Sequence, residues 1–275
     1  MSQINLLDLI CEKVKNLKAY QVETVEEGIK LHANENPYPP SPELKSLILA
    51  HLENLDLNRY PDPDCKSLKE AISNRLGVST DQLVIGNGSD ELIQHLMQVF
   101  CDDGDTVAFP EPTFAMYSIL AKGMGLNTQI FELDSKWDFE AKPVIKKLTS
   151  SHARIVFISY PNNPTGNCFS RTEIQKLIEN FEGIVVLDEA YYDFSGQTFI
   201  DQMKDHNNLV ILRSLSKIGL AGLRVGYGIF PRILVDEINK IRLPYNSNSL
   251  TQLAATELLN NFSLVQKQID SIKKE

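Results

Sequence analysis

The sequence has few features that would place the protein in a membrane or on nucleic acid. No apolar run reaches the roughly 18 residues that a membrane-spanning helix needs. The N-terminal segment carries Asp8 and Glu12 within its apolar stretch, which does not match a signal peptide. Its 36 acidic residues outnumber its 27 basic residues, and a net charge of −9 does not suit a general nucleic-acid binder. We therefore expect a cytoplasmic protein with neither a membrane nor a nucleic-acid partner.

Cysteine is scarce, and its positions indicate neither a disulfide framework nor a metal site. The four cysteines are Cys11, Cys65, Cys101 and Cys168, and no two are close enough for a CxxC motif. The five histidines are equally scattered and include no HExxH pattern. The sequence therefore predicts free thiols in a reducing compartment and no bound metal.

Short apolar runs rich in β-branched residues alternate with amphipathic segments through most of the chain. The runs are 83–86, 106–109, 127–133, 154–159, 184–188, 209–213 and 225–230. In the stretch 89–100, by contrast, apolar residues recur every three or four positions, as on one face of a helix. This alternation predicts an α/β fold with a mostly parallel sheet that helices cover on both faces.

Proline-rich segments interrupt the N-terminal part of the chain. Residues 32–42 and 58–64 combine several prolines with asparagine and aspartate, so neither can be a regular element throughout. A helix is expected to start near Ser41, with Pro42 in its first turn. An N-terminal arm therefore precedes an α/β body that spans roughly residues 65–230.

Two helices are expected further along the chain. Ser170 and Glu173 have the spacing of a capping box, which predicts a helix over 170–180. Residues 249–275 read as one long helix with an apolar stripe, and no later element follows that could cover the stripe.

Polar side chains gather where the predicted strands end, which is where ligands bind in parallel α/β sheets. The first such loop has Ser89 and Asp90 at the start of a helix, where free N–H groups can bind an anion. Taken alone, this loop favours a plain capped turn over an anion site. It does not complete a G-x-G-x-x-G pattern, so it does not predict a Rossmann dinucleotide site. The second loop carries Asn163, and the third carries Asp188 and Tyr191.

The fourth loop carries the most specific set of groups. It contains Ser214, Ser216, Lys217 and Arg224 within a short span after an apolar run. A single lysine is usually a solvated surface charge. A lysine flanked by groups that suit a phosphate is a candidate Schiff-base nucleophile.

Together the four loops suit a phosphorylated pyridine aldehyde, pyridoxal 5′-phosphate. Lys217 would form an imine with the aldehyde, and Asp188 would keep the pyridine nitrogen protonated. Asn163 and Tyr191 would donate hydrogen bonds to the ring phenolate oxygen. The phosphate would be held by Ser214, Ser216, Arg224 and the N–H groups near Ser89 and Asp90.

These loops belong to a longer series of motifs. The series reads LHANENPYPPSP, LNRYPDPD, GNGSDELI, EPTFAMY, YPNNPTGN, VVLDEAYYDF and RSLSKIGLAGLRVGYGI. On these motifs, the chain resembles the fold-type I pyridoxal-phosphate aminotransferases, and within them the histidinol-phosphate aminotransferase family. The resemblance runs from about Tyr20 to the C-terminus.

The resemblance implies roles for three aromatic residues and a homodimer. Phe114 would stack on the cofactor ring. Tyr60 would reach across the dimer interface to the cofactor phosphate of the partner subunit. Tyr20 would approach the substrate from the N-terminal arm.

The resemblance also implies three parts of the chain. Residues 1–44 would form the arm and the start of a small domain, and residues 45–248 the large cofactor-binding domain. Residues 249–275 would begin a C-terminal small domain that is cut short. The family carries a substrate-binding arginine in that domain, and no arginine of this sequence matches it.

The reaction implied by the resemblance is transamination, from histidinol phosphate to 2-oxoglutarate, in histidine biosynthesis. The partners would then be a small amino donor and a keto-acid acceptor. Three alternatives stay open: an aromatic aminotransferase, a threonine-phosphate decarboxylase, and a cofactor-binding fragment without competent turnover. A nucleotide-binding protein is the weakest alternative, because neither a Walker nor a Rossmann pattern occurs.

Overall fold

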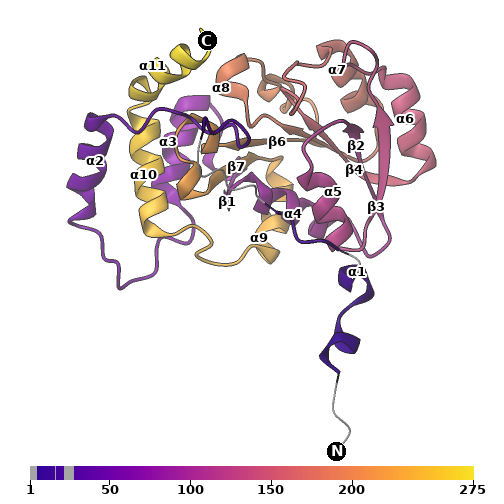
Figure 1. Ribbon diagram of the computed structural model, residues 1–275, viewed down its shortest axis with the longest axis horizontal. Helices are drawn as coiled ribbons and strands as arrows, with labels where there is room; N and C mark the ends of the chain where they lie inside the picture. The colour runs from indigo at the N-terminus through magenta and orange to yellow at the C-terminus, as the bar shows by residue number, and fades with distance from the viewer. Residues whose placement is uncertain (1–4, 16, 22–27) are drawn as a thin grey trace, which may run out of the picture.

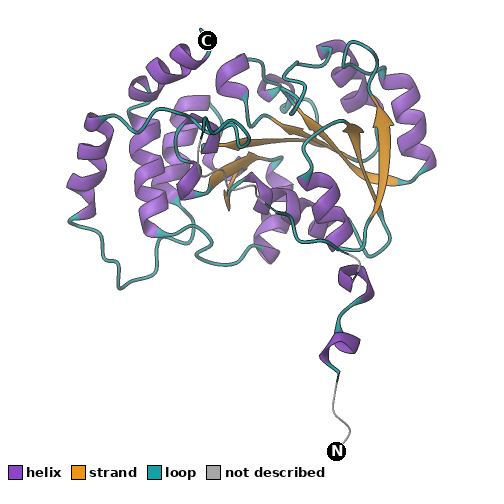
Figure 2. Ribbon diagram, in the orientation of Figure 1, coloured by secondary structure: helices purple, strands orange, loops and turns teal. Residues whose placement is uncertain are grey.

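The computed structural model describes residues 5–15, 17–21 and 28–275, and its centre is a seven-stranded sheet (Figures 1 and 2). The strands are β1 (Leu83–Asn87), β2 (Thr106–Glu111), β3 (Asn127–Glu132), β4 (Ala153–Ser159), β5 (Ile184–Asp188), β6 (Leu209–Ser214) and β7 (Val225–Ile229). Each predicted apolar run forms one of them. The spatial order is β1-β7-β6-β5-β4-β2-β3.

The sheet is parallel except at one strand. Neighbouring strands from β3 to β6 pair in parallel, whereas β7 is antiparallel to both β6 and β1. β1 consequently runs in the same direction as β6. The predicted mostly parallel α/β fold is confirmed, and the carboxyl ends of β1, β4, β5 and β6 lie at the same edge of the sheet.

Helices cover both faces of the sheet (Figure 1). Helices α4 (Ser89–Phe100), α5 (Met116–Gly123) and α9 (Arg232–Ile241) bury their apolar residues on one face. Helices α6 (Ala141–Ser150) and α7 (Arg171–Asn180) cover the other face. Because both faces are covered, all six residues of β6 are buried, which explains why the strand begins with four consecutive apolar residues before Arg213 and Ser214.

A separate group of helices lies beside the β1–β7 end of the sheet. It comprises α2 (Pro42–Leu52), α3 (Lys66–Leu76), α10 (Ser249–Asn260) and α11 (Ser263–Ile272), and α10 packs against both α2 and α3. As predicted, α2 starts with Pro42, and the Oγ atom of Ser41 accepts a hydrogen bond from the N–H of Leu44 at 3.2 Å. Two further α-helices are short, α1 (Glu12–Lys15) in the N-terminal arm and α8 (Tyr192–Ser195) after β5.

The prediction of one long, uncovered C-terminal helix is wrong. The chain leaves the helical conformation at Asn261, where φ is −117° and ψ is 38°, and α11 then starts at Ser263. Along the stripe, Leu258, Val265 and Ile269 are buried. The upstream helices α2 and α3 cover α10, and the turn at Ser216–Ile218 contacts α11, which are long-range contacts that the local pattern does not reveal.

The helix at 171–180 is confirmed, but its predicted capping box is wrong. The side chain of Ser170 makes no capping hydrogen bond. The Oε2 atom of Glu173 instead accepts a hydrogen bond from the N–H of Ala141, 2.8 Å away at the start of α6. The N–H of Ser170 donates to Asp138. Hydrogen bonds to the distant residues Ala141 and Asp138 therefore replace the predicted bonds between Ser170 and Glu173.

The structure also describes the state of the cysteines and the length of the helices. All four cysteines are free, as predicted. Within the described part of the chain, no helix is both long and apolar enough to cross a membrane. The division into parts at 44/45 and 248/249 stays a prediction.

Candidate functional site

A cavity lies at the carboxyl-end edge of the sheet, and most of the predicted site residues line it. Strands β1, β5 and β6 end there, and the loop after β4 reaches the same place. The residues that both the sequence and the structure assign to this cavity are Ser89, Asp90, Phe114, Asn163, Asp188, Tyr191, Ser214, Ser216, Lys217 and Arg224. Five separate loops of the sequence therefore converge on one small volume.

One wall of the cavity is built to hold an anion. Gly88, with φ of 80°, leads into the N-terminus of α4, and a Cβ atom there would lie 2.6 Å from Nη2 of Arg224. A Cβ atom on Gly226 of β7 would lie 2.2 Å from the backbone nitrogen of Ser89. Two glycines thus let the start of α4 sit directly against β7 and Arg224. The free N–H groups of the helix and a guanidinium consequently face the same space.

Two serines add hydroxyl groups to this wall. Nη1 of Arg224 lies 3.4 Å from Oγ of Ser216, and the N–H of Ser216 donates to Oγ of Ser214 at 3.1 Å. Nη2 of Arg224 also pairs with Asp90 at 3.1 Å. Helix N–H groups, hydroxyls and a guanidinium form a donor set that suits a phosphate dianion.

Asp188 forms the opposite wall, at the end of β5. It is 3% exposed, and the hydroxyl of Tyr117 donates a hydrogen bond to its Oδ2 atom at 2.9 Å. Burial raises the pKa of Asp188 to about 6, although the hydrogen bond from Tyr117 acts in the opposite direction. An anionic carboxylate at this position would be a strong partner for a protonated ring nitrogen.

Lys217 lies between these walls, in the turn that follows β6. Its Nζ atom donates a hydrogen bond to the carbonyl oxygen of Ala33 at 3.0 Å and lies 5.6 Å from the ring centroid of Tyr191. Burial lowers the pKa of the Lys217 ammonium, while the negative charges of Asp90 and Asp188 partly offset this effect. A lysine with a lowered pKa is more readily available as the neutral amine.

Aromatic and amide groups complete the cavity. Phe114 meets the ring of Tyr117 edge to face, with the ring centroids 5.6 Å apart. The hydroxyl of Tyr191 accepts a hydrogen bond from Nδ2 of Asn34 at 3.0 Å. Asn163 lines the cavity from the loop after β4.

Two predicted residues do not line this cavity. Tyr60 is 81% exposed and stacks on Tyr245, with the ring centroids 4.5 Å apart. Tyr20 is 65% exposed. The roles assigned to both tyrosines therefore stay predictions.

Sequence reasoning missed three groups at the site. Tyr117 reads as one apolar position of α5, and its contact with Asp188 joins segments that are far apart in the sequence. Ala33 contributes only a backbone carbonyl, which no side-chain pattern reveals. Asn34 belongs to the LHANENPYPPSP motif, which was the available signal in the sequence.

The residues present fit pyridoxal phosphate, judged by the chemistry of the donor set. An anion-binding wall faces a buried carboxylate, and an amine of lowered pKa lies between them. The cradle formed by Gly88 and Gly226 has no room for a Cβ atom, so the anion wall depends on those glycines.

The raised pKa of Asp188 predicts a pH-dependent gain in stability for Asp188→Asn. Well below pH 3.8 the carboxyl is neutral in both the folded and the unfolded protein, so folding has no charge to bury. Above its folded pKa of about 6, folding buries the charge, and the shift of the pKa from its ordinary value of 3.8 corresponds to a cost of about 3 kcal/mol. In the cofactor-free protein, Asp188→Asn should therefore raise the free energy of unfolding by about this amount at pH 8 and by less than about 1 kcal/mol at pH 4.

Urea unfolding of the cofactor-free protein at the two pH values tests this expectation. Asp205→Asn is the matched control, because the Asp205 side chain is 62% exposed, and it should change stability at neither pH. Equal effects of Asp188→Asn at pH 4 and pH 8 would contradict the raised pKa.

Comparison with known proteins places this site in a family. Residues 26–275 match the family described as aminotransferase class I and II. The chain is 42% identical over 256 residues to a histidinol-phosphate aminotransferase of Nitrosococcus oceani, covering 93% of this chain and 71% of that protein. It is 40% identical over 268 residues to one from Aquifex aeolicus, covering 97% and 75% respectively.

A solved structure shares the fold. It is a histidinol-phosphate aminotransferase from Sinorhizobium meliloti, crystallised in complex with pyridoxal-5′-phosphate. The TM-score is 0.81 at 22% sequence identity, and the alignment covers 88% of this chain and 67% of that one. Since the family match spans every loop that lines the cavity, the chain belongs to the aminotransferases of class I and II.

Proposed function

We propose that the protein is a pyridoxal-phosphate-dependent aminotransferase that acts on histidinol phosphate and 2-oxoglutarate in histidine biosynthesis. The reaction would yield imidazole acetol phosphate and glutamate. The observation that carries the proposal is the position of Lys217, between a buried carboxylate and an anion-binding wall. Relatives of at least 40% identity named histidinol-phosphate aminotransferase support the choice of substrate.

Most of the cavity residues would bind and orient the cofactor. When bound, pyridoxal phosphate supplies an aldehyde for covalent attachment and a ring that withdraws electrons from the substrate α-carbon. Asp188 would hold the ring nitrogen in its protonated form, and Phe114 would pack on the ring face. Asn163 and Tyr191 would donate to the ring oxygen. The phosphate would be held by Ser89, Asp90, Ser214, Ser216 and Arg224.

Lys217 would carry out the proton transfer. As a neutral amine it would take a proton from the substrate α-carbon and deliver it to the cofactor carbon. Its lowered pKa supports this role, because a larger fraction of the amine is then unprotonated at neutral pH. The carbonyl of Ala33 accepts from Nζ at 3.0 Å and would aim the amine into the cavity.

We extend the proposal to the assembly and location of the protein. We infer a cytoplasmic homodimer in which Tyr60 contacts the cofactor phosphate of the partner subunit and Tyr20 approaches the substrate. The 81% exposure of Tyr60 agrees with a role outside its own subunit. We also propose that the chain divides into an N-terminal part over 1–44, a large domain over 45–248 and a C-terminal part over 249–275.

A substrate panel tests the proposed reaction. The purified protein with pyridoxal phosphate should form glutamate from histidinol phosphate and 2-oxoglutarate. Release of carbon dioxide from threonine phosphate would instead favour a decarboxylase, and a preference for tyrosine or phenylalanine would favour an aromatic aminotransferase. Tight cofactor binding without turnover of any donor would favour a fragment that lacks catalytic competence.

A further inference from the structure

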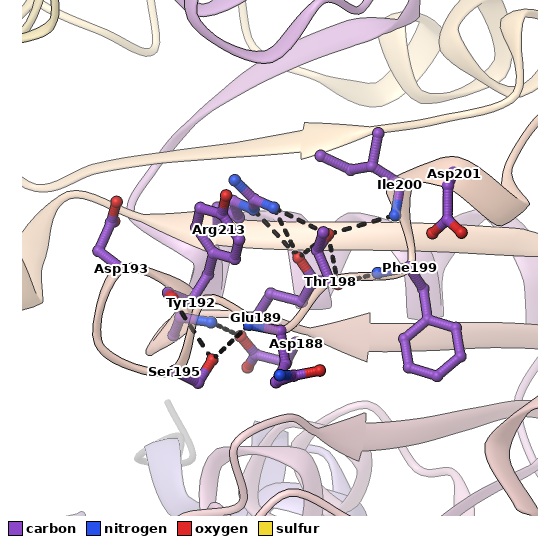
Figure 3. A network of polar contacts seen from close by, with 12 residues as sticks. Asp188, Glu189, Tyr192, Asp193, Ser195, Thr198, Phe199, Ile200, Asp201 and Arg213 are labelled. Carbon is purple, nitrogen blue, oxygen red and sulfur yellow. Dashed lines mark hydrogen bonds and ion pairs between the residues drawn. The ribbon is translucent and has the colours of Figure 1, made fainter. Parts of the chain in front are cut away.

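A second pair of charged residues lies directly behind the candidate site. Glu189 follows Asp188 at the end of β5, and Arg213 precedes Ser214 on β6. Successive residues of an extended strand point to opposite faces of the sheet. Glu189 and Arg213 therefore point away from the cavity that Asp188 and Ser214 line, and they contact Phe199 and its neighbours on the other face (Figure 3).

The pair is buried and joined by several hydrogen bonds. Glu189 is 1% exposed and Arg213 is 2% exposed. Nη2 and Nε of Arg213 lie 2.8 Å and 3.1 Å from the same oxygen, Oε2 of Glu189. The hydroxyl of Thr198 donates to this oxygen at 2.8 Å, and the N–H of Phe199 donates to Oε1 at 2.8 Å (Figure 3). The guanidinium carbon of Arg213 lies 3.4 Å from the ring centroid of Tyr192.

Stability alone does not account for such a pair. Removing two charges from water costs about as much as their attraction returns, so well-packed apolar substitutes for a buried ion pair are often neutral or stabilising. The location of this pair suggests another role. The regular pairing of β5 with β6 ends at Asp188 and Leu212, and the N–H of Glu189 still donates to the carbonyl of Leu212 at 2.8 Å.

The pair therefore joins two strand ends just where the loops of the site depart. Asp188 and Tyr191 leave from β5, whereas Ser214 and Lys217 leave from β6. Any ligand held by Asp188 and Lys217 together needs a fixed separation between those two strands. A misplacement of about 1 Å can lower a rate about 100-fold.

We propose that Glu189 and Arg213 are positioning residues, which set the distance between Asp188 and Lys217 by bridging the ends of β5 and β6 on the rear face of the sheet. The inference rests on the proposed function, because it concerns the same cofactor site. Neither residue touches the cavity, so both act only through the groups that they hold.

The double variant Glu189→Met with Arg213→Met removes both charges and retains side chains of similar length. In the cofactor-free protein we expect its urea midpoint to lie close to that of the wild type, because the removal of both buried charges offsets the loss of the acceptor for the N–H of Phe199. We expect pyridoxal phosphate to bind about 10-fold more weakly, and kcat to fall about 100-fold at saturating cofactor. The KM for 2-oxoglutarate should stay within about twofold, because substrate contacts are unchanged.

The control is a more exposed ion pair at the opposite edge of the sheet, in which the side chains of Arg154 and Asp105 are 59% and 27% exposed. Arg154 of β4 pairs with Asp105, just before β2, with Nε 3.4 Å from Oδ2. The double variant Arg154→Met with Asp105→Leu removes the same two kinds of charge far from the cavity. It should match the wild type in cofactor affinity and kcat.

Each result of the experiment has a defined meaning. Wild-type kcat and wild-type cofactor affinity in the Glu189 and Arg213 double variant would overturn the inference. If that variant does not fold, Arg213→Lys replaces it, because lysine keeps the charge but cannot make the two-nitrogen contact. Arg213→Lys should lower kcat about 10-fold, and an unchanged kcat would again overturn the inference. If the wild type binds no pyridoxal phosphate, the proposed function itself has failed.

Discussion

Lys217→Ala should abolish transamination, with kcat reduced by about 10⁴-fold or more. The substitution removes the amine that attaches the cofactor and also the base that moves the α-proton. Proton transfer by a positioned base is alone worth about 10²–10⁴-fold, and the loss of the nucleophile adds to this. Single-turnover and steady-state assays with histidinol phosphate would measure the effect.

The same variant should still bind the cofactor without forming a covalent bond to it. The anion wall built from α4 and Arg224 does not depend on Lys217. The control is Lys240→Ala, because Lys240 lies on the surface of α9 and pairs only with Glu237 among the described residues. That control should keep wild-type activity. Activity of Lys217→Ala within tenfold of the wild type would contradict the assignment of the lysine.

Glu189→Ala should lower the free energy of unfolding of the cofactor-free protein by about 3–5 kcal/mol. The substitution leaves the guanidinium of Arg213 buried without its carboxylate, and it also removes an acceptor from the N–H of Phe199. An unpaired buried charge is among the largest single destabilising changes known. Urea unfolding at pH 7 would measure the loss.

A surface pair gives the matched comparison. Glu237→Ala removes a carboxylate 2.6 Å from Lys240, but both side chains are about half exposed or more. Exposed pairs of this kind contribute about 0–1 kcal/mol. If Glu189→Ala lowers the free energy of unfolding no more than Glu237→Ala does, the buried Glu189–Arg213 pair contributes no more to stability than an exposed pair, which would contradict this prediction.

The strands were predictable from the sequence for a physical reason. A strand that is covered on both faces carries consecutive apolar side chains, as the first four residues of β6 do, so the run itself identifies the strand. The apolar pattern does not indicate whether a strand runs parallel or antiparallel to its neighbours. The antiparallel orientation of β7 therefore emerged only from its pairing with β1 and β6.

The site was predictable in part, because its groups follow strand ends in a parallel sheet. Lys217, Asp188 and Asn163 each follow an apolar run, and the common edge of the sheet brings them together. Tyr117 and the carbonyl of Ala33 were not predictable in this way. Their contacts with Asp188 and Lys217 join distant segments, which no local spacing encodes.

Local patterns failed where a distant partner competed for the same group. Glu173 has capping-box spacing, yet its carboxylate binds the N–H of Ala141 at the start of another helix. Likewise, the apolar stripe on α10 and α11 is covered by distant segments, because α2 and α3 pack against α10 and the turn at Ser216–Ile218 contacts α11. Both errors arise from tertiary contacts that replace the local interaction.

Reduction with borohydride followed by peptide mapping tests the central claim most directly. The purified protein is incubated with pyridoxal phosphate, reduced and digested, and the pyridoxyl label is located by mass spectrometry. We expect one predominant label, on Lys217, because its amine has a lowered pKa and faces the cavity. A folded protein that carries no label, or one labelled at other lysines instead, would contradict the assignment of this cavity as the cofactor site.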